Sequence, residues 1–274
     1  MIKLIGINIY PIKSIAGLRL NRANLDKKGF ENDRRWMLVD QNGLFLSQRK
    51  DTALTRVVLE MGSEGQSLVL KDRLEVVDPI VLPLQAPSKS SGMKVQVWDD
   101  FCTALRAGQT YDDWFSAVIG KACHLVYMPD NWHRQVDLRY AQSSDQVSFA
   151  DGFPFLLASQ DSLADLNQRM DDPIEMIRFR PNLIISGNGA WTEDQWKSFS
   201  IGDQTFRSLK PCARCVLLTV NPETGMKGSE PLQTLSTFRK RNNKIFFGMN
   251  ACWDFQSSST GSFLEIGMEV KPIL

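Results

Sequence analysis

Histidine, long apolar runs and an excess of charge of either sign are all scarce in this chain. Only two of its 274 residues are histidine, so zinc sites that need several imidazole ligands are poorly supplied. No apolar run approaches the roughly 20 residues that a membrane-spanning helix needs, so we expect no membrane association. The formal net charge is +1, which gives no overall positive field that would indicate nucleic acid as a partner.

Cysteine is also sparse, with five residues that are scattered except for one close pair. An odd number of scattered thiols fits a reducing compartment better than a disulfide framework. The first residues, MIKLIGINIYPIKS, lack the long apolar stretch and the small-residue cleavage site of a signal peptide. A cytoplasmic protein is therefore expected, and 274 residues suffice to bury a core without disulfide bonds.

Short apolar segments separated by turn residues predict β-structure in the first part of the chain. Ile5, Ile7 and Ile9 alternate with small or polar residues, which is the period of a half-buried strand. The segment Asp40-Gln41-Asn42-Gly43 contains the Asn-Gly pair that favours a hairpin turn, with a return strand from Phe45. Further strands are expected at residues 55–61, 67–70 and 95–98, a spacing typical of a barrel or a sandwich.

The remaining segments predict a few helices, more short strands and polar loops. Helices are expected at residues 112–119 and from a cap at Ser159 to Met170. Strands are expected at residues 183–186, in a hairpin around residues 199–203, and as one final alternating strand over residues 264–270. Loops are expected at residues 85–92, 143–144 and 257–259. The fold class is therefore mostly β with some α, in two closely joined parts that divide near residue 121.

The segment Lys210-Pro211-Cys212-Ala213-Arg214-Cys215 carries the most chemistry, and the residues alone leave several interpretations open. A thioredoxin-like redox pair needs a strand followed by a helix, a zinc knuckle needs two more ligands, and two ordinary buried thiols need nothing. Adjacent cations such as Lys210 and Arg214 lower the pKa of a thiol, and a thiolate is a natural ligand for a soft metal centre. These features suggest one reactive thiolate without identifying the metal.

Several segments, taken together, resemble the MOSC-domain family. The run KPCARCVLLTVNPETG followed by EPLQTLSTFR is similar to its signature, and YPIKSIAGL, NDRRWMLVD, SQRKD, SFADGFPFLLAS, SLADLN and FRPNLIISG follow the family order. The resemblance is to the subgroup of the mitochondrial amidoxime-reducing component and its bacterial counterpart, which detoxifies hydroxylaminopurine-type base analogues. It implies an N-terminal β-barrel domain at residues 1–120 packed on a MOSC β-barrel domain at residues 121–274.

The same resemblance implies a molybdenum cofactor, in which molybdenum is held by the dithiolene of a molybdopterin. Cys215 matches the metal ligand and would be the catalytic residue, whereas Cys212 would be a packed thiol or a group beside the metal. Asp151 matches a wall of the cofactor pocket, although a turn role is equally open. The residues implied to bind the cofactor are Lys13, Ser14, Arg34, Arg49, Asp151, Arg180, Asn182 and Arg214.

The implied activity is the reduction of N-hydroxylated compounds such as amidoximes, hydroxylamines and N-hydroxylated base analogues. Because no cysteine cluster for an iron–sulfur domain follows, electrons are expected from a separate ferredoxin-, flavoprotein- or cytochrome-type protein. The basic run at residues 239–244 is usually a solvated loop, although it could dock an acidic partner of this kind. The alternatives are a non-catalytic carrier of the cofactor or sulfur-transfer module, and an inert β-barrel interaction module. One departure from the family, Asn221 in TVNP, replaces an aspartate and keeps the turn chemistry.

Overall fold

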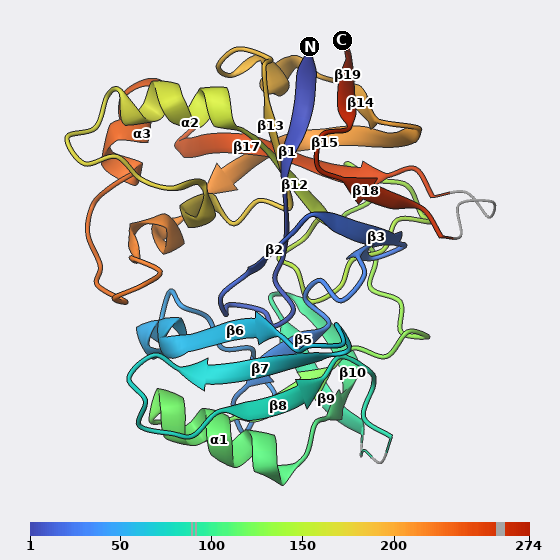
Figure 1. The fold of residues 1–274 in the computed structure, drawn as a ribbon, viewed down its shortest axis with the longest axis vertical. Helices are drawn as coiled ribbons and strands as arrows, with labels where there is room; N and C mark the ends of the chain where they lie inside the picture. Colours follow the sequence, from blue (N-terminus) through green and yellow to red (C-terminus); the bar gives the residue numbers. More distant parts are fainter. Residues whose placement is uncertain (89, 91, 256–260) are drawn as a thin grey trace.

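The computed structural model describes residues 1–88, 90, 92–255 and 261–274, and it has two lobes (Figure 1). The upper lobe in that view contains the start of the chain and most of its second half. The lower lobe contains the sheets and the helix formed by residues 36–127. The fold is mostly β with a few helices, as predicted. The expected loop at residues 257–259, and residues 89 and 91 of the loop at 85–92, lie outside the described residues.

The upper lobe is built on a closed barrel of seven strands. Successive strands pair side by side, and the ring is completed because its first and last strands also pair with each other. In ring order they are β12 (Phe155–Ser159), β13 (Leu183–Ser186), β1 (Ile2–Ile9), β19 (Glu269–Ile273), β14 (Ser198–Ile201), β15 (Gln204–Arg214) and β17 (Lys244–Trp253). Short strands β2 (Leu18–Leu20) and β16 (Lys240–Arg241) extend the sheet beside β1 and β17. Apolar side chains from all seven strands fill the barrel.

Strand β1 does not follow the alternation that its sequence suggests. The pairing of β1 with β13 shifts register between Leu4 and Gly6, which is where a bulge inserts one extra residue. As a result Leu4, Ile7 and Ile9 point into the barrel core, whereas Ile5 packs on its outside. The predicted strand is present, but both of its faces are covered over most of its length.

Helices on the outside of the barrel cover the face that Ile5 shares. Helix α2 (Gln160–Asn167) begins where predicted, because the Ser159 hydroxyl accepts a hydrogen bond of 3.1 Å from the Asp161 amide. It ends at Asn167, one turn before the predicted end at Met170. Helix α3 (Leu232–Phe238) was not predicted. Single turns of 3₁₀-helix occur at η2 (Met176–Phe179), η3 (Thr192–Gln195) and η4 (Val216–Thr219).

The lower lobe consists of two small sheets and one helix. A four-stranded sheet has the order β5 (Trp36–Val39), β11 (His124–Tyr127), β10 (Asp100–Arg106) and β9 (Gly92–Val97). A three-stranded sheet follows the order β6 (Val57–Met61), β7 (Ser67–Asp72) and β8 (Ile80–Pro83), preceded by η1 (Thr52–Arg56). The predicted helix is α1 (Gln109–Ile119), which buries Trp114, Phe115 and Val118 against these sheets. The strands expected in this region are all present.

Two predicted β-segments are wrong in detail. The final strand expected over residues 264–270 is two strands, β18 (Phe263–Glu265) and β19, which belong to different sheets. Gly267 separates them with φ +96°, a conformation that breaks a strand and favours glycine. The turn at residues 40–43 is present, with Gly43 at φ +80°, but its return segment makes single bridges, including one from Phe45 to Val39, rather than a strand.

The two parts of the chain interleave where the lobes meet. Strand β1 lies in the barrel that residues 155–273 otherwise form. Conversely, β18 near the end of the chain pairs with β3 (Arg22–Asp26), which also pairs with β4 (Gly29–Phe30). The division of the chain at residues 120 and 121 stays a prediction.

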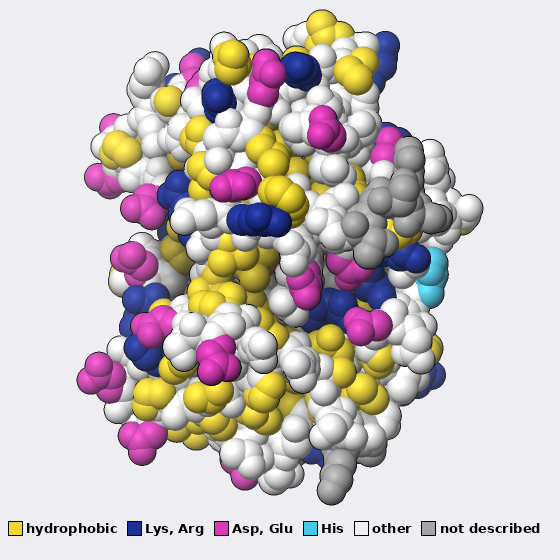
Figure 2. Space-filling model, turned by 45° about the vertical axis from the view of Figure 1, so that its right-hand side comes forward, with side chains coloured by type: hydrophobic (Ala, Val, Ile, Leu, Met, Phe, Trp, Pro, Cys, Tyr) yellow, Lys and Arg dark blue, Asp and Glu magenta, His cyan; other side chains and the backbone are white. Residues whose placement is uncertain are grey.

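The described residues carry neither a membrane-crossing helix nor a face dominated by one charge in the view shown. None of the described helices combines the length and apolar composition that crossing a bilayer would need. Figure 2 shows basic and acidic side chains interspersed over the face that it presents, so no field of one sign covers that face.

Candidate functional site

A cavity of about 430 Å³ opens between the two halves of the chain, and it brings the predicted site residues together. All nine residues singled out from the sequence line it, although they come from segments more than a hundred positions apart. They are Lys13, Ser14, Arg34, Arg49, Asp151, Arg180, Asn182, Arg214 and Cys215. The first half contributes four of them and the second half five, so the cavity requires both halves.

Cys215 is the one exposed cysteine of the five. Strand β15 ends at Arg214, and Cys215 follows in an extended conformation before the turn of η4 begins. Burial raises the pKa of Cys102 and Cys123 to about 11 and that of Cys252 to about 12, so these three thiols stay protonated inside the core. Accessibility therefore selects Cys215, with the half-buried Cys212 beside it, as the thiol available to a ligand.

The local structure favours neither of the other functional interpretations of the cysteine pair. Cys212 lies within β15, and Cys215 leads into a single 3₁₀ turn rather than the α-helix of a thioredoxin-like site. Among the described residues, no three His, Cys, Asp or Glu side chains gather in a way that could hold a metal ion. The Cys212 thiol instead lies 3.1 Å from Nη1 of Arg214, which also donates through Nη2 to the Phe179 carbonyl. A zinc knuckle is thus not formed in this part of the chain.

One wall of the cavity is an ion-pair cluster centred on Asp151. The buried Lys13 donates to Oδ1 of Asp151 at 2.5 Å and to the Phe149 carbonyl at 2.8 Å. Arg49 lies 3.6 Å from Oδ2 of Asp151 and stacks on the Trp98 ring at 4.1 Å, and the Trp98 indole donates to Asp151 at 3.2 Å. The Asp151 side chain is nevertheless 64% exposed, so it faces the cavity rather than the core.

The charges of this cluster shift the pKa values of both partners of the ion pair. Burial lowers the pKa of Lys13 to about 8, although Asp151 acts in the opposite direction. Partial desolvation raises the pKa of Asp151, but Lys13 and Arg49 outweigh it and hold that pKa well below its usual range. Asp151 is therefore ionised at neutral pH, and Lys13 carries a charge that weakly alkaline conditions remove.

A second wall consists of two arginines on one tyrosine. The guanidinium carbons of Arg34 and Arg180 lie 4.3 and 4.2 Å from the centroid of the Tyr10 ring. Arg34 is neutralised by an ion pair of 2.5 Å with the buried Asp33. Arg180 has no side-chain hydrogen bond or ion pair within the described residues, and burial lowers its pKa to about 10. Arg180 thus presents an uncompensated positive charge to the cavity.

Asn182 acts through Arg34 rather than from the open wall. Its side chain is 1% exposed, its Oδ1 accepts from Arg34 at 3.0 Å and from the Leu156 amide at 3.3 Å, and its Nδ2 donates to the Asn8 carbonyl at 3.2 Å. These contacts use most of its hydrogen-bonding capacity. Asn182 is therefore a positioning residue that fixes Arg34 on Tyr10.

Three of the lining residues adopt backbone conformations that cost energy. Ser14, Arg34 and Arg180 have φ values of 64°, 49° and 55°, in the left-handed region that favours glycine. Such conformations cost about 1–3 kcal/mol each and persist where the surroundings hold them, often at functional sites. The backbone at these positions aims polar side chains into the cavity at the expense of local stability.

Sequence reasoning missed Tyr10, Asp33 and Trp98, although each supports a predicted residue. Tyr10 and Asp33 stand next to recognised motifs, within YPIKS and NDRR, so the motifs themselves were the signal. Trp98 adopts φ +56°, which is uncommon for a bulky residue and cannot be read from the sequence. Its contact with Asp151 joins segments 53 positions apart.

Comparisons with known proteins agree with this geometry. Residues 1–122 match the model of the MOSC N-terminal beta barrel domain, and residues 144–271 match that of the MOSC domain. Mitochondrial amidoxime-reducing component 1 of Homo sapiens is 31% identical over 243 residues, which cover 85% of this chain and 70% of that protein. The counterpart of Mus musculus is 31% identical over 84% of this chain and 69% of that protein.

Larger proteins match as well. Molybdenum cofactor sulfurase of Oryza sativa subsp. japonica is 30% identical over 99% of this chain, and the chain spans 35% of that protein's length. The two matched domains together account for most of the chain. The chain belongs to the MOSC family, with a MOSC N-terminal beta barrel domain followed by a MOSC domain.

Proposed function

We propose that the cavity binds a molybdenum cofactor through Cys215 and that the protein reduces N-hydroxylated compounds. One observation carries the proposal: an exposed thiol lines the same cavity as Arg180, a cation without a counter-charge in the described structure. The names of the relatives, amidoxime-reducing component and molybdenum cofactor sulfurase, support the choice of cofactor, and the first of them supports the choice of substrate.

The residues present fit such a cofactor. The volume of about 430 Å³ lies within the usual range for small-molecule sites. The buried Nε atoms of Arg49 and Arg214 have no hydrogen-bond partner, and Arg180 has no counter-ion, so the cavity offers donors for a phosphate and for a polar ring system. Because Cys215 stands without a cluster of further ligands in the described chain, its metal must bring other ligands of its own, as a molybdopterin dithiolene does.

Each lining residue then has a chemical task. Cys215 supplies the protein ligand, and Arg180, Arg34 and Lys13 supply positive charge for an anionic group. Ser14 is free to donate or accept through its hydroxyl, while Asn182 keeps Arg34 in place. Asp151 and Trp98 hold Lys13 and Arg49 on the opposite wall. This arrangement orients a ligand from two sides and leaves the Cys215 side accessible to substrate.

When bound, the cofactor supplies a two-electron redox centre that accepts the oxygen of an N–OH group. The overall reaction converts N–OH and two electrons with two protons into N–H and water. The electrons come from a separate ferredoxin-, flavoprotein- or cytochrome-type protein. The exposure of Cys215 supports this scheme, because it gives both the substrate and solvent protons access to that side of the cavity.

Metal content and turnover test the proposal together. Protein produced in a host that makes the cofactor is assayed for molybdenum, for the fluorescent oxidised pterin, and for benzamidoxime reduction with reduced methyl viologen. Cys215→Ser should fold normally but lose molybdenum and turnover. Cys212→Ser, which alters a thiol in the same cavity, should keep at least half of each and serves as the matched control.

The outcomes separate the proposal from its alternatives. Undiminished turnover in Cys215→Ser would rule out the assigned ligand. Molybdenum bound through Cys215 without turnover of any N-hydroxylated compound would indicate a cofactor carrier or sulfur-transfer module. Protein that takes up no cofactor would indicate an interaction module.

A further inference from the structure

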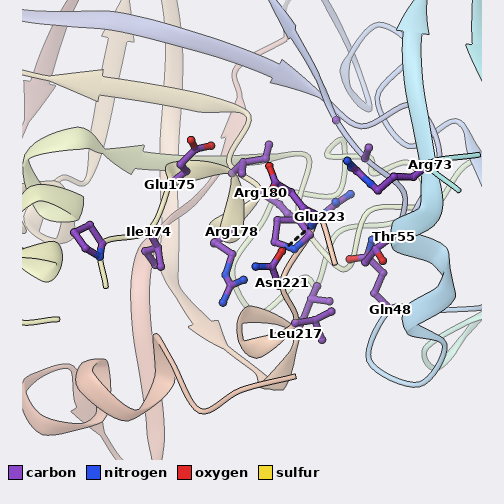
Figure 3. A pocket seen from close by; sticks show the side chains of 16 residues that line it. Gln48, Thr55, Arg73, Ile174, Glu175, Arg178, Arg180, Leu217, Asn221 and Glu223 are labelled. Carbon is purple, nitrogen blue, oxygen red and sulfur yellow. Dashed lines mark hydrogen bonds between the residues drawn. The ribbon is translucent and has the colours of Figure 1, made fainter. Parts of the chain in front are cut away.

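A second cavity of about 420 Å³ adjoins the first and shares two of its lining residues, Arg180 and Leu217. We call it the Arg73 pocket. Its walls include the residue after β7, the turn η1, the segment that leads into η2, and the residues around and after η4. The residues that carry the argument are Arg73, Arg178, Arg180, Leu217, Asn221 and Glu223, most of them labelled in Figure 3.

Arginines with unused donors dominate the chemistry of the Arg73 pocket. The guanidinium of Arg73 makes no hydrogen bond or ion pair within the described residues, and its side chain is exposed. Arg178 donates one bond of 3.3 Å to the Glu230 carbonyl, but its buried Nε has no partner. Burial lowers the pKa of Arg178, which is the sign of a cation without a nearby counter-charge.

The carboxylates of this pocket do not neutralise its arginines. Glu175 and Glu223 also line it, yet neither forms an ion pair in the described part of the chain. Figure 3 shows Arg73 and Arg178 on opposite sides of the pocket, with Asn221 and Glu223 between them. Asn221 is occupied by accepting bonds from the amides of Glu223 and Thr224, so it shapes the turn instead of compensating the arginines.

Apolar side chains complete the pocket beside these charges. Ile174, Ile177, Leu217 and Val220 line it together with prolines. A pocket with an apolar surface and a few placed cations suits an organic molecule that carries an anionic group. Because Arg180 and Leu217 belong to both cavities, such a molecule can extend from one cavity into the other.

We propose that the Arg73 pocket binds a carboxylate or phosphate group of the substrate, whose N–OH end lies in the neighbouring cavity at Cys215. The proposal rests on the proposed function and adds the substrate class, namely N-hydroxylated compounds with a negative charge at the far end. Guanidinium groups bind carboxylates and phosphates in a bidentate manner, and two free ones on opposite walls select for such a group. The phosphate of the cofactor itself is the competing source of the same chemistry.

The experiment compares 4-carboxybenzamidoxime with the neutral benzamidoxime in cofactor-loaded protein. The measured quantity is the ratio of their kcat/KM values, together with molybdenum content per protein. Arg73→Gln should lower the ratio about tenfold, the loss that accompanies one charge-assisted hydrogen bond. Glu223→Gln should raise it, because it removes a negative charge that repels the carboxylate. Arg22→Gln, an exposed arginine on β3 outside both cavities, is the control and should leave the ratio unchanged.

Binding of the product analogue 4-carboxybenzamidine, measured by calorimetry on the same proteins, keeps this test separate from turnover. Weaker binding to Arg73→Gln than to wild type would support the pocket even if neither amidoxime were reduced, a result that would refute only the proposed function. A ratio and a binding constant unaffected by Arg73→Gln and by Arg178→Gln would overturn the proposal. Reduced molybdenum content with an unchanged ratio would also overturn it, by assigning the pocket to the cofactor's phosphate.

Discussion

Lys13 and Asp151 form an ion pair of 2.5 Å between positions 138 residues apart. The pair joins the two halves of the chain at the wall of the candidate site. Its lysine is 4% exposed, whereas the side chain of its aspartate is 64% exposed and faces the cavity. The charge of Lys13 is therefore under tension between burial, which opposes it, and Asp151, which supports it.

The charge of Lys13 predicts a pH limit for retention of an anionic cofactor. Burial lowers the pKa of Lys13 to about 8, so the side chain is charged below that pH and neutral above it. We expect cofactor retention, measured as molybdenum remaining after gel filtration, to fall as the pH rises through about 8. Asp151→Asn should move this fall to lower pH, and Lys13→Arg, whose charge persists, should abolish it. Retention that is flat from pH 7 to 9.5 in wild type would contradict the assignment.

The same pKa predicts the opposite trend for stability of the cofactor-free protein. An unfolded chain has a lysine pKa near its ordinary value of about 10.4, so between pH 8 and that value it binds more protons than the folded chain. Lys13 alone therefore makes the free energy of unfolding rise with pH in this window. Urea unfolding of wild type and Lys13→Met at several pH values measures its contribution as the difference in slope. Equal slopes would show that Lys13 titrates normally.

Tyr10 is predicted to hold two arginines by its ring rather than by its hydroxyl. The ring contacts the guanidinium groups of Arg34 and Arg180, and the hydroxyl donates one bond of 3.2 Å to the Pro181 carbonyl. Tyr10→Phe should keep cofactor retention and lose about 1 kcal/mol of stability. Tyr10→Leu should lower retention markedly, because each cation–π contact contributes about 0.5–2 kcal/mol. Equal retention in the two variants would argue against a role for the ring.

Asn182 and Arg34 are predicted to be energetically coupled. Asn182→Ala removes a buried amide with three partners, which should cost about 1–3 kcal/mol in urea unfolding. Because Arg34 depends on that amide for its position, the effects of Asn182→Ala and Arg34→Ala on cofactor retention should fall short of additivity by at least about 0.5 kcal/mol. Strict additivity in the double variant would mean that Asn182 contributes independently of Arg34.

Gly248 is predicted to be essential for closing the barrel. It has φ +78°, and a Cβ atom there would lie 2.6 Å from the Leu157 carbonyl oxygen on the neighbouring strand β12. Gly248→Ala should therefore cost more than the roughly 1–2 kcal/mol of left-handed strain alone. Gly267→Ala is the matched control, because its φ is +96° but a Cβ would meet open space. Similar unfolding free energies for the two variants would exclude the clash with β12.

The residues of the site were more predictable from the sequence than their roles. The nine predicted residues stand in recognisable motifs, and all of them line one cavity. The turning of Asn182 away from the open wall depends on contacts with Asn8 and Leu156, which no local pattern records. Likewise the unpaired state of Arg73 depends on how the two lobes face each other, and a single arginine in a sequence carries no sign of it.

The errors in the fold have a common physical origin. Alternation rules assume an unbroken pleat, but β1 contains a register shift between Leu4 and Gly6 that exchanges inward and outward positions. The predicted last strand fails for a related reason, since Gly267 permits a turn that an apolar–polar alternation cannot reveal. Elements with strong local signals, such as the cap at Ser159, were predicted correctly because the hydrogen bond to Asp161 is local.

The position of β1 in the ring sets an order of events during synthesis on the ribosome. This strand is translated first, yet its two barrel neighbours are β13 and β19, and β19 ends at Ile273. At the usual elongation rate of about 5–20 residues per second, β1 waits on the order of tens of seconds for its second neighbour. Cys215 and Arg180 also emerge late, so cofactor insertion can only follow release of a nearly complete polypeptide.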